Sequence, residues 1–493
     1  MTSARWAEKA SALCVVAFLG VLAFADLGRP FGNGDEVIYA QNIREMAASG
    51  DYGTLQWFGV AVHQRPVLPF SIAAALAEAG GGEAGARLSS ALFHFGTLLL
   101  VFLLGRRFWG RTDAAAVGAL VLACTPTFHE FGRMLMSDPP FVAAVVVALG
   151  ATAAAQSDSK FLPAAFAALG SAFAFKSLAA AVPGAALAPA LVLAARRAPR
   201  RRWVLGVLLF FGFAAPFYVA GVREGGSAFL QGHFGYSLVA RARGELMLGL
   251  DGGVLAYLRH MASADGVWPA ATFALGSLGA FVVGLRERDV ALSLVGGFAV
   301  AVFVLLSLLG TRLPHYLLPA YPAAALGFAG LVARGLDRAG PWGTPPRSWL
   351  AVGVALALGS GGPARSGDQF PGGVPSKLLG EAAAAHPDLP LYIHEWWSPA
   401  VGYYAGRPYT LTTSDERFWS IVDDVDFIRA AGRLRRVPPI PSEPVVLVAW
   451  DRSVPLPVWW TGAQELAEWG PYVLLRATPA TSLSAPRPSS VAP

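Results

Sequence analysis

Acidic side chains that could act on a hydroxyl group occur at two places in the sequence. Asp35 and Glu36 are adjacent in FGNGDEVIYAQNIREM (31–46), directly after an apolar stretch, and Asp138 precedes two prolines in GRMLMSDPPFV. A carboxylate can take the proton of an attacking hydroxyl group as a general base. A simpler structural role is also open, because Asp is a good helix N-cap and an acidic first turn complements the helix dipole.

Cationic and histidine side chains are predicted at the same boundary between water and lipid. Arginine can stabilise a departing phosphate through paired hydrogen bonds, and an apolar groove could hold a lipid tail. This mixture suits a reaction whose donor is a lipid-linked sugar phosphate. The candidate binding residues are His63, Arg65, Arg133, Lys176, His233, Arg312, His315 and Tyr316. The alternative is that the arginines anchor the chain at the headgroups and the histidines are ordinary interfacial residues.

A divalent metal ion could bridge a carboxylate and such a phosphate. No metal-binding motif in the sequence requires one. The two cysteines, Cys14 and Cys124, lie in different apolar runs near opposite predicted membrane faces. We therefore expect neither a disulfide nor a zinc site from them.

The elements that must position these residues are membrane helices. Of the 493 residues, 55% are hydrophobic and 14% are charged, against about 25% charged residues in soluble proteins. Because each crossing needs about 20 apolar residues, we expect a polytopic α-helical membrane protein with about 11 transmembrane helices. The apolar runs are 11–28, 87–105, 113–129, 139–155, 161–175, 177–195, 203–221, 267–285, 290–309, 313–333 and 349–361.

The short loops that are rich in lysine and arginine all fall on one side of this arrangement. The strongest is RRAPRRR (196–202), and the positive-inside rule makes that side cytoplasmic. We therefore expect a multi-pass protein of the cytoplasmic (inner) membrane with its N-terminus inside and its C-terminus outside. Nucleic acid is not an expected partner, since the sequence has no basic arm with interleaved aromatic residues.

Two outer loops, 29–86 and 222–266, are predicted to contain helices that lie on the membrane. The helix that starts at Asp35 has apolar residues at helical spacing. The apolar segment 66–80 is shorter than a crossing and is expected to be re-entrant or interfacial.

The character of the sequence changes near residue 361. GSGGPARSGDQFPGG has the composition of a linker, so residues 1–360 form the predicted transmembrane domain. The runs PLYIHEWW, PVVLVAW and YVLLRA predict strands, with a helix near 415–431. Residues 361–480 are therefore expected to form a small α/β domain outside the membrane, followed by a disordered tail, 481–493.

As an ordered set, the motifs resemble the polyprenyl-phosphate-dependent glycosyltransferases of the GT-C fold. That group includes the aminoarabinose transferases for lipid A and the protein O-mannosyltransferases. NGDEVIYAQNIREM resembles the first outer loop of these enzymes, GRMLMSDPPFV their second acidic motif, AFKSLAAAVPG their Lys-Gly helix start, and RLPHYLLPAYPA their Lys-x-Pro-x-Tyr-Leu-Leu-Pro motif. Three of the motifs depart from the pattern: Arg65-Pro66-Val67 replaces Lys-Pro-Pro, Ser177 replaces Gly, and Arg312 replaces Lys.

The resemblance implies a role for each acidic residue and for the cations. Asp35 would be the catalytic base, while Glu36 and Asp138 would orient the acceptor or hold a divalent metal ion. Arg65 would bind the phosphate, and the last motif would border the donor head group through Arg312 and Tyr316.

The reaction that the resemblance implies is the transfer of a sugar, hexosyl or pentosyl, from a polyprenyl-phosphate donor. The acceptor would be an envelope lipid such as lipid A, a glycan or a protein outside the membrane, and the anomeric centre would be inverted.

Two other classes of function remain open at this point. A transporter or flippase for a lipid-linked saccharide would place ionisable residues near the middle of the membrane, whereas the predicted spans carry almost no charge apart from Lys176. A non-catalytic protein that uses its outer domain as a binding module is the third class.

Overall fold

The computed structural model describes most of the chain, in two compact units. The described residues are 3–32, 34–62, 65–243, 249–250, 253–340, 373–396, 398–414, 419, 434–435, 445–456 and 460–479. The first unit comprises Met1–Gly28, Met46–Leu55 and His63–Gln369, and the second comprises Arg29–Glu45, Gln56–Val62 and Phe370–Pro493.

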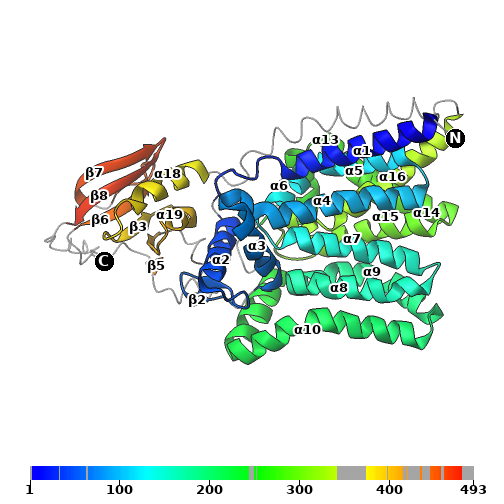
Figure 1. The fold of residues 1–493 in the computed structure, drawn as a ribbon, viewed down its shortest axis with the longest axis horizontal. Helices are drawn as coiled ribbons and strands as arrows, with labels where there is room; N and C mark the ends of the chain where they lie inside the picture. Colours follow the sequence, from blue (N-terminus) through cyan, green and yellow to red (C-terminus); the bar gives the residue numbers. More distant parts are fainter. Residues whose placement is uncertain are drawn as a thin grey trace, which may run out of the picture. The chain divides into compact units, whose positions relative to one another are not determined.

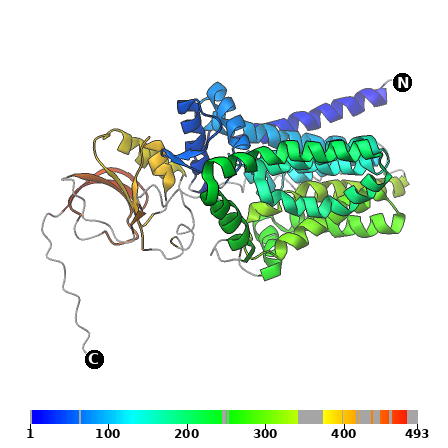
Figure 2. The ribbon, with the colours of Figure 1, turned by 90° about the horizontal axis from the view of Figure 1, so that it is seen from below.

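The first unit is a bundle of apolar helices whose long members run side by side in both views (Figures 1 and 2). Its α-helices are α1 (Ser3–Phe24), α3 (Leu68–Gly80), α4 (Gly82–Trp109), α5 (Thr112–Ala123), α6 (Pro126–Arg133), α7 (Asp138–Ala155), α8 (Leu162–Lys176), α9 (Ala181–Arg197), α10 (Arg200–Leu230), α11 (Arg241–Arg243), α12 (Ala256–His260), α13 (Val267–Ala274), α14 (Ala280–Glu287), α15 (Val290–Ser307) and α16 (Ala320–Arg338).

Shorter 3-10 and π segments join these helices. They are η1 (Ser159–Phe161), η2 (Ser177–Ala180), η3 (Gln231–Ala240), η4 (Gly253–Leu255), η5 (Met261–Asp265), η6 (Leu275–Gly279) and η7 (Pro314–Leu317).

The predicted fold class is confirmed, and nearly every predicted run coincides with a helix. Within the described residues, six helices are long and apolar enough to cross a membrane, or seven if the bent pair α5 and α6 is one crossing. The predicted run 113–129 is not one straight helix, because α5 and α6 meet at 71° around Pro126, which starts α6. The run 349–361 lies outside the described residues.

Residues Ser159–Arg197 form one helical stretch of 39 residues. A straight helix of that length would measure about 58 Å, roughly twice the hydrocarbon core. The stretch breaks at Ser177, whose φ is +50°, and Gln156 at the end of α7 donates to the carbonyl oxygen of Ala190 in α9. Helix α9 therefore folds back beside α8, and the predicted division into two runs, 161–175 and 177–195, matches the helices.

Three of the basic loops that were predicted to share one side of the membrane are joined by ion pairs at one end of the bundle. Arg111 bonds Asp113 and, at 2.8 Å, Asp337, which joins the α4–α5 loop to the end of α16. Arg334 pairs with Glu287 and Asp289 in the α14–α15 turn. These ion pairs tie three of the basic loops to one another.

The second unit contains a mixed six-stranded sheet with strand order β5-β4-β3-β6-β8-β7 (Figure 1). The strands are β3 (Leu391–His394), β4 (Thr410–Thr412), β5 (Leu434–Arg435), β6 (Val446–Asp451), β7 (Trp460–Trp469) and β8 (Tyr472–Pro479). Strands β3 to β6 pair in parallel, and β8 pairs antiparallel with β6 and β7. The three strands predicted from the sequence are β3, β6 and β8.

Both faces of this sheet are buried. Leu391 and Ile393 of β3 pack on one face, in a core cluster shared with α18 (Gly373–Ala384) and α19 (Pro399–Tyr404), while Tyr392 packs on the other. Alternate residues of a strand point to opposite faces. Because both faces of this sheet are buried, the residues on both are apolar, which explains the continuous apolar runs in the sequence. The predicted helix at 415–431 and the tail 481–493 fall outside the described residues, except Trp419.

The two units are not continuous in sequence, and the predicted domain boundary at residue 360 stays a prediction. Part of the first outer loop, Arg29–Glu45 and Gln56–Val62, belongs to the sheet-containing unit. The backbone N–H of Phe31 donates to the Tyr404 hydroxyl at 2.7 Å, and the Phe31 ring packs edge-on against Tyr403. The short hairpin β1 (Gln56–Trp57) and β2 (Val60–Ala61) also lies in this unit.

Candidate functional site

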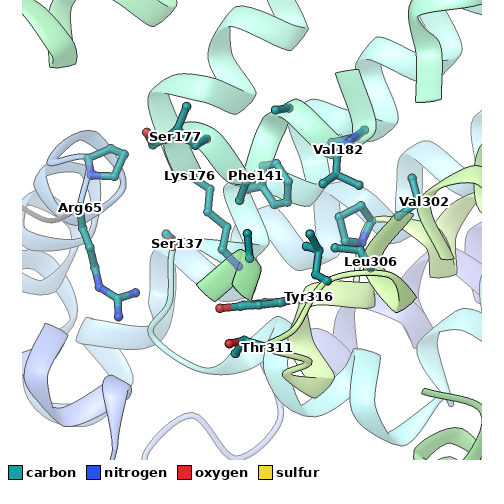
Figure 3. A pocket seen from close by; sticks show the side chains of 18 of the residues that line it. Arg65, Ser137, Phe141, Lys176, Ser177, Val182, Val302, Leu306, Thr311 and Tyr316 are labelled. Carbon is teal, nitrogen blue, oxygen red and sulfur yellow. The ribbon is translucent and has the colours of Figure 1, made fainter. Parts of the chain in front are cut away.

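A cavity of about 230 Å³ opens among the helices of the first unit. Its lining combines cationic, hydroxyl and apolar side chains (Figure 3). The polar lining residues are Arg65, Ser137, Lys176, Ser177, His233, Thr311 and Tyr316, and the apolar ones include Phe141, Val182, Val302, Leu306 and Leu309. The cavity thus brings together four predicted binding residues: Arg65, Lys176, His233 and Tyr316.

Lys176 and Asp138 form a buried ion pair at this cavity. Lys176 is the last residue of α8, and Asp138 is the first residue of α7, so the antiparallel pairing of these helices brings the two charges together. The exposed fractions of the side chains are 13% for Lys176 and 2% for Asp138. The Lys176 ammonium also lies 5.6 Å from the ring centroid of Phe141 and 5.5 Å from that of Tyr316.

Arg65 supplies the second cation. In Figure 3 its guanidinium lies to the left of Tyr316 and Thr311, and Lys176 extends down toward Tyr316. The cavity therefore has two cations among its lining residues, and the carboxylate of Asp138 is paired with one of them, Lys176. This arrangement makes the polar part of the cavity suitable for an anion. The residues Val302, Leu306 and Leu309 provide an apolar wall.

Ser177 and His233 form a hydrogen bond that the sequence did not reveal. The Ser177 hydroxyl lies 2.6 Å from His233 Nε2 and 2.6 Å from the Tyr218 hydroxyl. The imidazole is stacked on Phe229, with ring centroids 5.2 Å apart and 4° between the planes. The only sequence signal was that Ser177 replaces the glycine of the family pattern, at a position whose positive φ favours glycine.

Three predicted binding residues do not line the cavity in the described part of the chain. Arg133 is buried and donates to the carbonyl oxygen of Ala25 at 2.6 Å. Arg312 donates to the carbonyl oxygen of Ser307, the last residue of α15, at 3.1 Å. A cation at that position stabilises the helix C-terminus.

His315 packs between Phe131 and Tyr316 at centroid distances of 5.1 and 5.0 Å. Arg312 bonds the end of α15 and is not among the cavity residues, so its place at the donor stays a prediction, while Tyr316 lies at the cavity. His63 lies outside the described residues.

Asp35 and Glu36 belong to the second unit, in α2 (Asp35–Ser49). The helix begins at Asp35, so this residue is the first helical residue and not the N-cap, and both carboxylates lie in the first turn. Glu36 is buried with 3% exposure, whereas Asp35 is partly exposed and accepts a hydrogen bond from the Tyr39 hydroxyl at 3.2 Å. Their participation in one site with Asp138 stays a prediction.

Helix α2 is not the membrane-surface helix that its spacing suggested. Tyr39 and Ile43 of its apolar face are buried in the protein, and so are Gln41 and Asn42. The polar side chains are accommodated by local bonds, including one from Gln41 to Glu45.

The described residues do not fit a metal site. They contain no group of three or more His, Cys, Asp or Glu side chains placed to hold an ion. Asp138, one of the two predicted ligands, is paired with Lys176, and a cation in contact with a carboxylate opposes binding of a second cation.

Comparison with known proteins agrees with the motifs. Residues 63–219 match the family model described as dolichyl-phosphate-mannose-protein mannosyltransferase. This segment contains Arg65, Asp138 and Lys176 and lies within the region of the predicted resemblance. No curated protein matches the chain by sequence.

Solved structures with the same fold are membrane glycosyltransferases. ArnT from Cupriavidus metallidurans, bound to undecaprenyl phosphate, is 20% identical, with a TM-score of 0.73, over 96% of this chain and 98% of ArnT. The arabinofuranosyltransferase AftD from Mycobacteria is 16% identical, with a TM-score of 0.52, over 97% of this chain and 40% of AftD. The Archaeoglobus fulgidus oligosaccharyltransferase, in complex with zinc and sulfate, is 13% identical, with a TM-score of 0.50, over 89% of this chain and 68% of that enzyme.

The predicted resemblance is confirmed by the family-model match and by the fold. The chain has the GT-C fold of membrane glycosyltransferases, with a small mixed-sheet domain near its C-terminus.

Proposed function

We propose that this protein transfers a sugar from a polyprenyl-phosphate donor to an acceptor outside the cytoplasmic membrane. The observation that carries the proposal is the cavity in which Arg65 and Lys176 lie beside an apolar wall. A lipid-linked sugar phosphate needs both features, because its phosphate is anionic and its chain is apolar. The undecaprenyl phosphate bound to the similar structure of ArnT supports a donor of this class.

In the proposed reaction, Arg65 and Lys176 bind the donor phosphate and stabilise the charge that it gains on leaving. Asp35 takes the proton from the acceptor hydroxyl as its oxygen attacks the anomeric carbon opposite the phosphate. The bond between that carbon and the phosphate oxygen breaks, and its electron pair leaves with the polyprenyl phosphate. The sugar is transferred with inversion, and Asp35 releases the proton afterwards.

Asp138 and Glu36 would have supporting roles. The ion pair with Asp138 fixes the Lys176 ammonium at the cavity, and the buried Glu36 follows the base in the first turn of α2. Adjacent helical residues point about 100° apart, so the two carboxylates of α2 would not act on the same atom.

The proposed location is the cytoplasmic membrane, with the N-terminus and the basic loops inside. The ion pairs that join the loops around Arg111 and Arg334 at one end of the bundle support a common side for them. The sheet domain would then lie outside, where an envelope lipid, a glycan or a protein would be the acceptor.

The test is to incubate the purified protein with a panel of polyprenyl-phosphate sugars and candidate acceptors. Mass spectrometry of the released polyprenyl phosphate and of the glycosylated acceptor identifies the donor used. We expect Asp35→Asn to abolish transfer while binding of the donor remains. Normal turnover by this variant would rule out Asp35 as the base. Movement of a lipid-linked saccharide across proteoliposomes without any sugar transfer would instead establish a transporter.

A further inference from the structure

Thr311 presents a buried hydroxyl at the cavity. Its exposed fraction is 2%, and it is one of the lining residues. Among the described residues, its Oγ1 has no hydrogen-bond partner. Burying an unpaired hydroxyl destabilises a folded protein, whereas valine has the same shape without that cost. A bound ligand that accepts a hydrogen bond would account for threonine at this position.

The backbone fixes the place of this hydroxyl. Thr311 follows Gly310, whose N–H donates to the carbonyl oxygen of Ala242 at 2.9 Å. It precedes Arg312, whose carbonyl oxygen accepts from the N–H of Leu250 at 2.6 Å. The segment is therefore held on both sides of Thr311, and the hydroxyl is positioned in advance for a ligand in the cavity.

The chemistry around Thr311 indicates which part of a ligand it would meet. In Figure 3, Thr311 lies next to Tyr316, and the Arg65 guanidinium lies to the left of both. The Lys176 ammonium is 5.5 Å from the Tyr316 ring centroid. Two cations among the lining residues favour an anionic group in this cavity, and a hydroxyl that donates to an anion makes a stronger bond than one that donates to a neutral oxygen.

We propose that the Thr311 hydroxyl donates a hydrogen bond to a phosphate oxygen of the polyprenyl-phosphate donor. This inference rests on the proposed function and adds a binding residue to it. Thr311 contributes no charge, so it would orient the phosphate between the cations.

The test uses the full-length protein in lipid nanodiscs, with undecaprenyl phosphate as the probe. We expect Thr311→Val to bind the probe about tenfold more weakly, the effect of losing one hydrogen bond to a charged group. Without the probe, the melting temperature of the variant should equal or exceed that of the wild type, because an unpaired hydroxyl has been removed. Thr311→Ser, which keeps the hydroxyl, should restore most of the binding.

Ser307 supplies a matched control. Its hydroxyl is also buried, with 4% exposure, and it too has no partner among the described residues. Ser307 is not among the residues that line the cavity. Ser307→Ala should therefore leave binding of undecaprenyl phosphate unchanged.

Three outcomes would overturn the inference. Equal binding by Thr311→Val and the wild type, while Arg65→Met loses binding, overturns the role of Thr311 and leaves the proposed function standing. If Thr311→Val binds a sugar-bearing donor more weakly than the wild type but binds undecaprenyl phosphate equally well, Thr311 contacts the sugar and not the phosphate. Failure of the wild type to bind any polyprenyl phosphate overturns the proposed function as well.

Discussion

The guanidinium of Arg44 lies 4.0 Å from the ring centroid of Tyr403 and donates a 2.8 Å hydrogen bond to the carbonyl oxygen of the same residue. The two residues are 359 positions apart in the sequence. Burial lowers the pKa of Arg44 below its ordinary value, and the neighbouring Tyr403 and Glu45 partly oppose this effect. The part of this helix from Asp35 to Glu45 is thus folded as part of the sheet-containing unit.

This contact predicts that the sheet domain positions the proposed base. Arg44→Ala removes a stacked and partly desolvated cation, worth about 1–2 kcal/mol, and should lower kcat about tenfold with little change in the dissociation constant for the donor. Lysine should not restore kcat, because it cannot reproduce the planar stacking of arginine. Steady-state kinetics with separate measurement of donor binding provides the test.

Arg452 is the control for this prediction. It forms exposed ion pairs with Glu465 and Glu468 in the same unit, which contribute at most about 1 kcal/mol. Arg452→Ala should leave kcat unchanged. An equal loss of activity in both variants would mean that the effect is general destabilisation of the domain.

The Lys176–Asp138 pair predicts a non-additive effect on stability. Lys176→Met leaves the buried Asp138 carboxylate without its cation, a change that costs about 3–5 kcal/mol for buried pairs. The double variant with Asp138→Asn removes both charges and should be more stable than Lys176→Met alone. Thermal unfolding of the four proteins gives the coupling energy, and additive effects would contradict a direct pair. Both variants that lack Lys176 should bind polyprenyl phosphate weakly.

The strained backbone at Ser177 predicts an unusual order of stability. Its φ of +50° and ψ of −132° favour glycine. Ser177→Ala keeps the strain and loses the hydrogen bonds to His233 and Tyr218, whereas Ser177→Gly loses the same bonds but relieves the strain. We expect the free energy of unfolding of the glycine variant to exceed that of the alanine variant by about 1 kcal/mol. The glycine variant should therefore melt at the higher temperature. The opposite order in calorimetry would show that the strain is absent in solution.

His394 predicts a pH dependence of the sheet-containing unit. Burial lowers the pKa of His394, although Glu395 partly opposes the shift, and its Nδ1 lies 2.9 Å from the Thr412 hydroxyl. As pH falls below about 6.5, the unfolded chain takes up a proton before the folded one does.

The free energy of unfolding of this unit should therefore be constant well above pH 6.5 and fall below it, by up to about 1.4 kcal/mol per pH unit. Tryptophan fluorescence during thermal unfolding, from pH 5 to pH 8, measures the slope. In His394→Gln the slope should flatten, and an unchanged slope would assign it to another group.

Local properties of the sequence determined the helices and strands. The apolar runs became helices because a chain in lipid must satisfy its backbone hydrogen bonds within each segment, and the runs around Ile393 and Val448 became strands buried on both faces. The motifs likewise pointed to Arg65, Lys176 and Tyr316, which do line one cavity.

Tertiary structure decided where the side chains point and which partners they meet. Arg312 bonds the end of α15 and does not line the cavity in the described residues, whereas Thr311, one residue earlier, lines it without any sequence signal. The loop that carries Asp35 joined the sheet-containing unit through contacts of Phe31 and Arg44 with residues more than 350 positions away. Such pairings depend on how distant helices and strands pack, and no local pattern of residues encodes that packing.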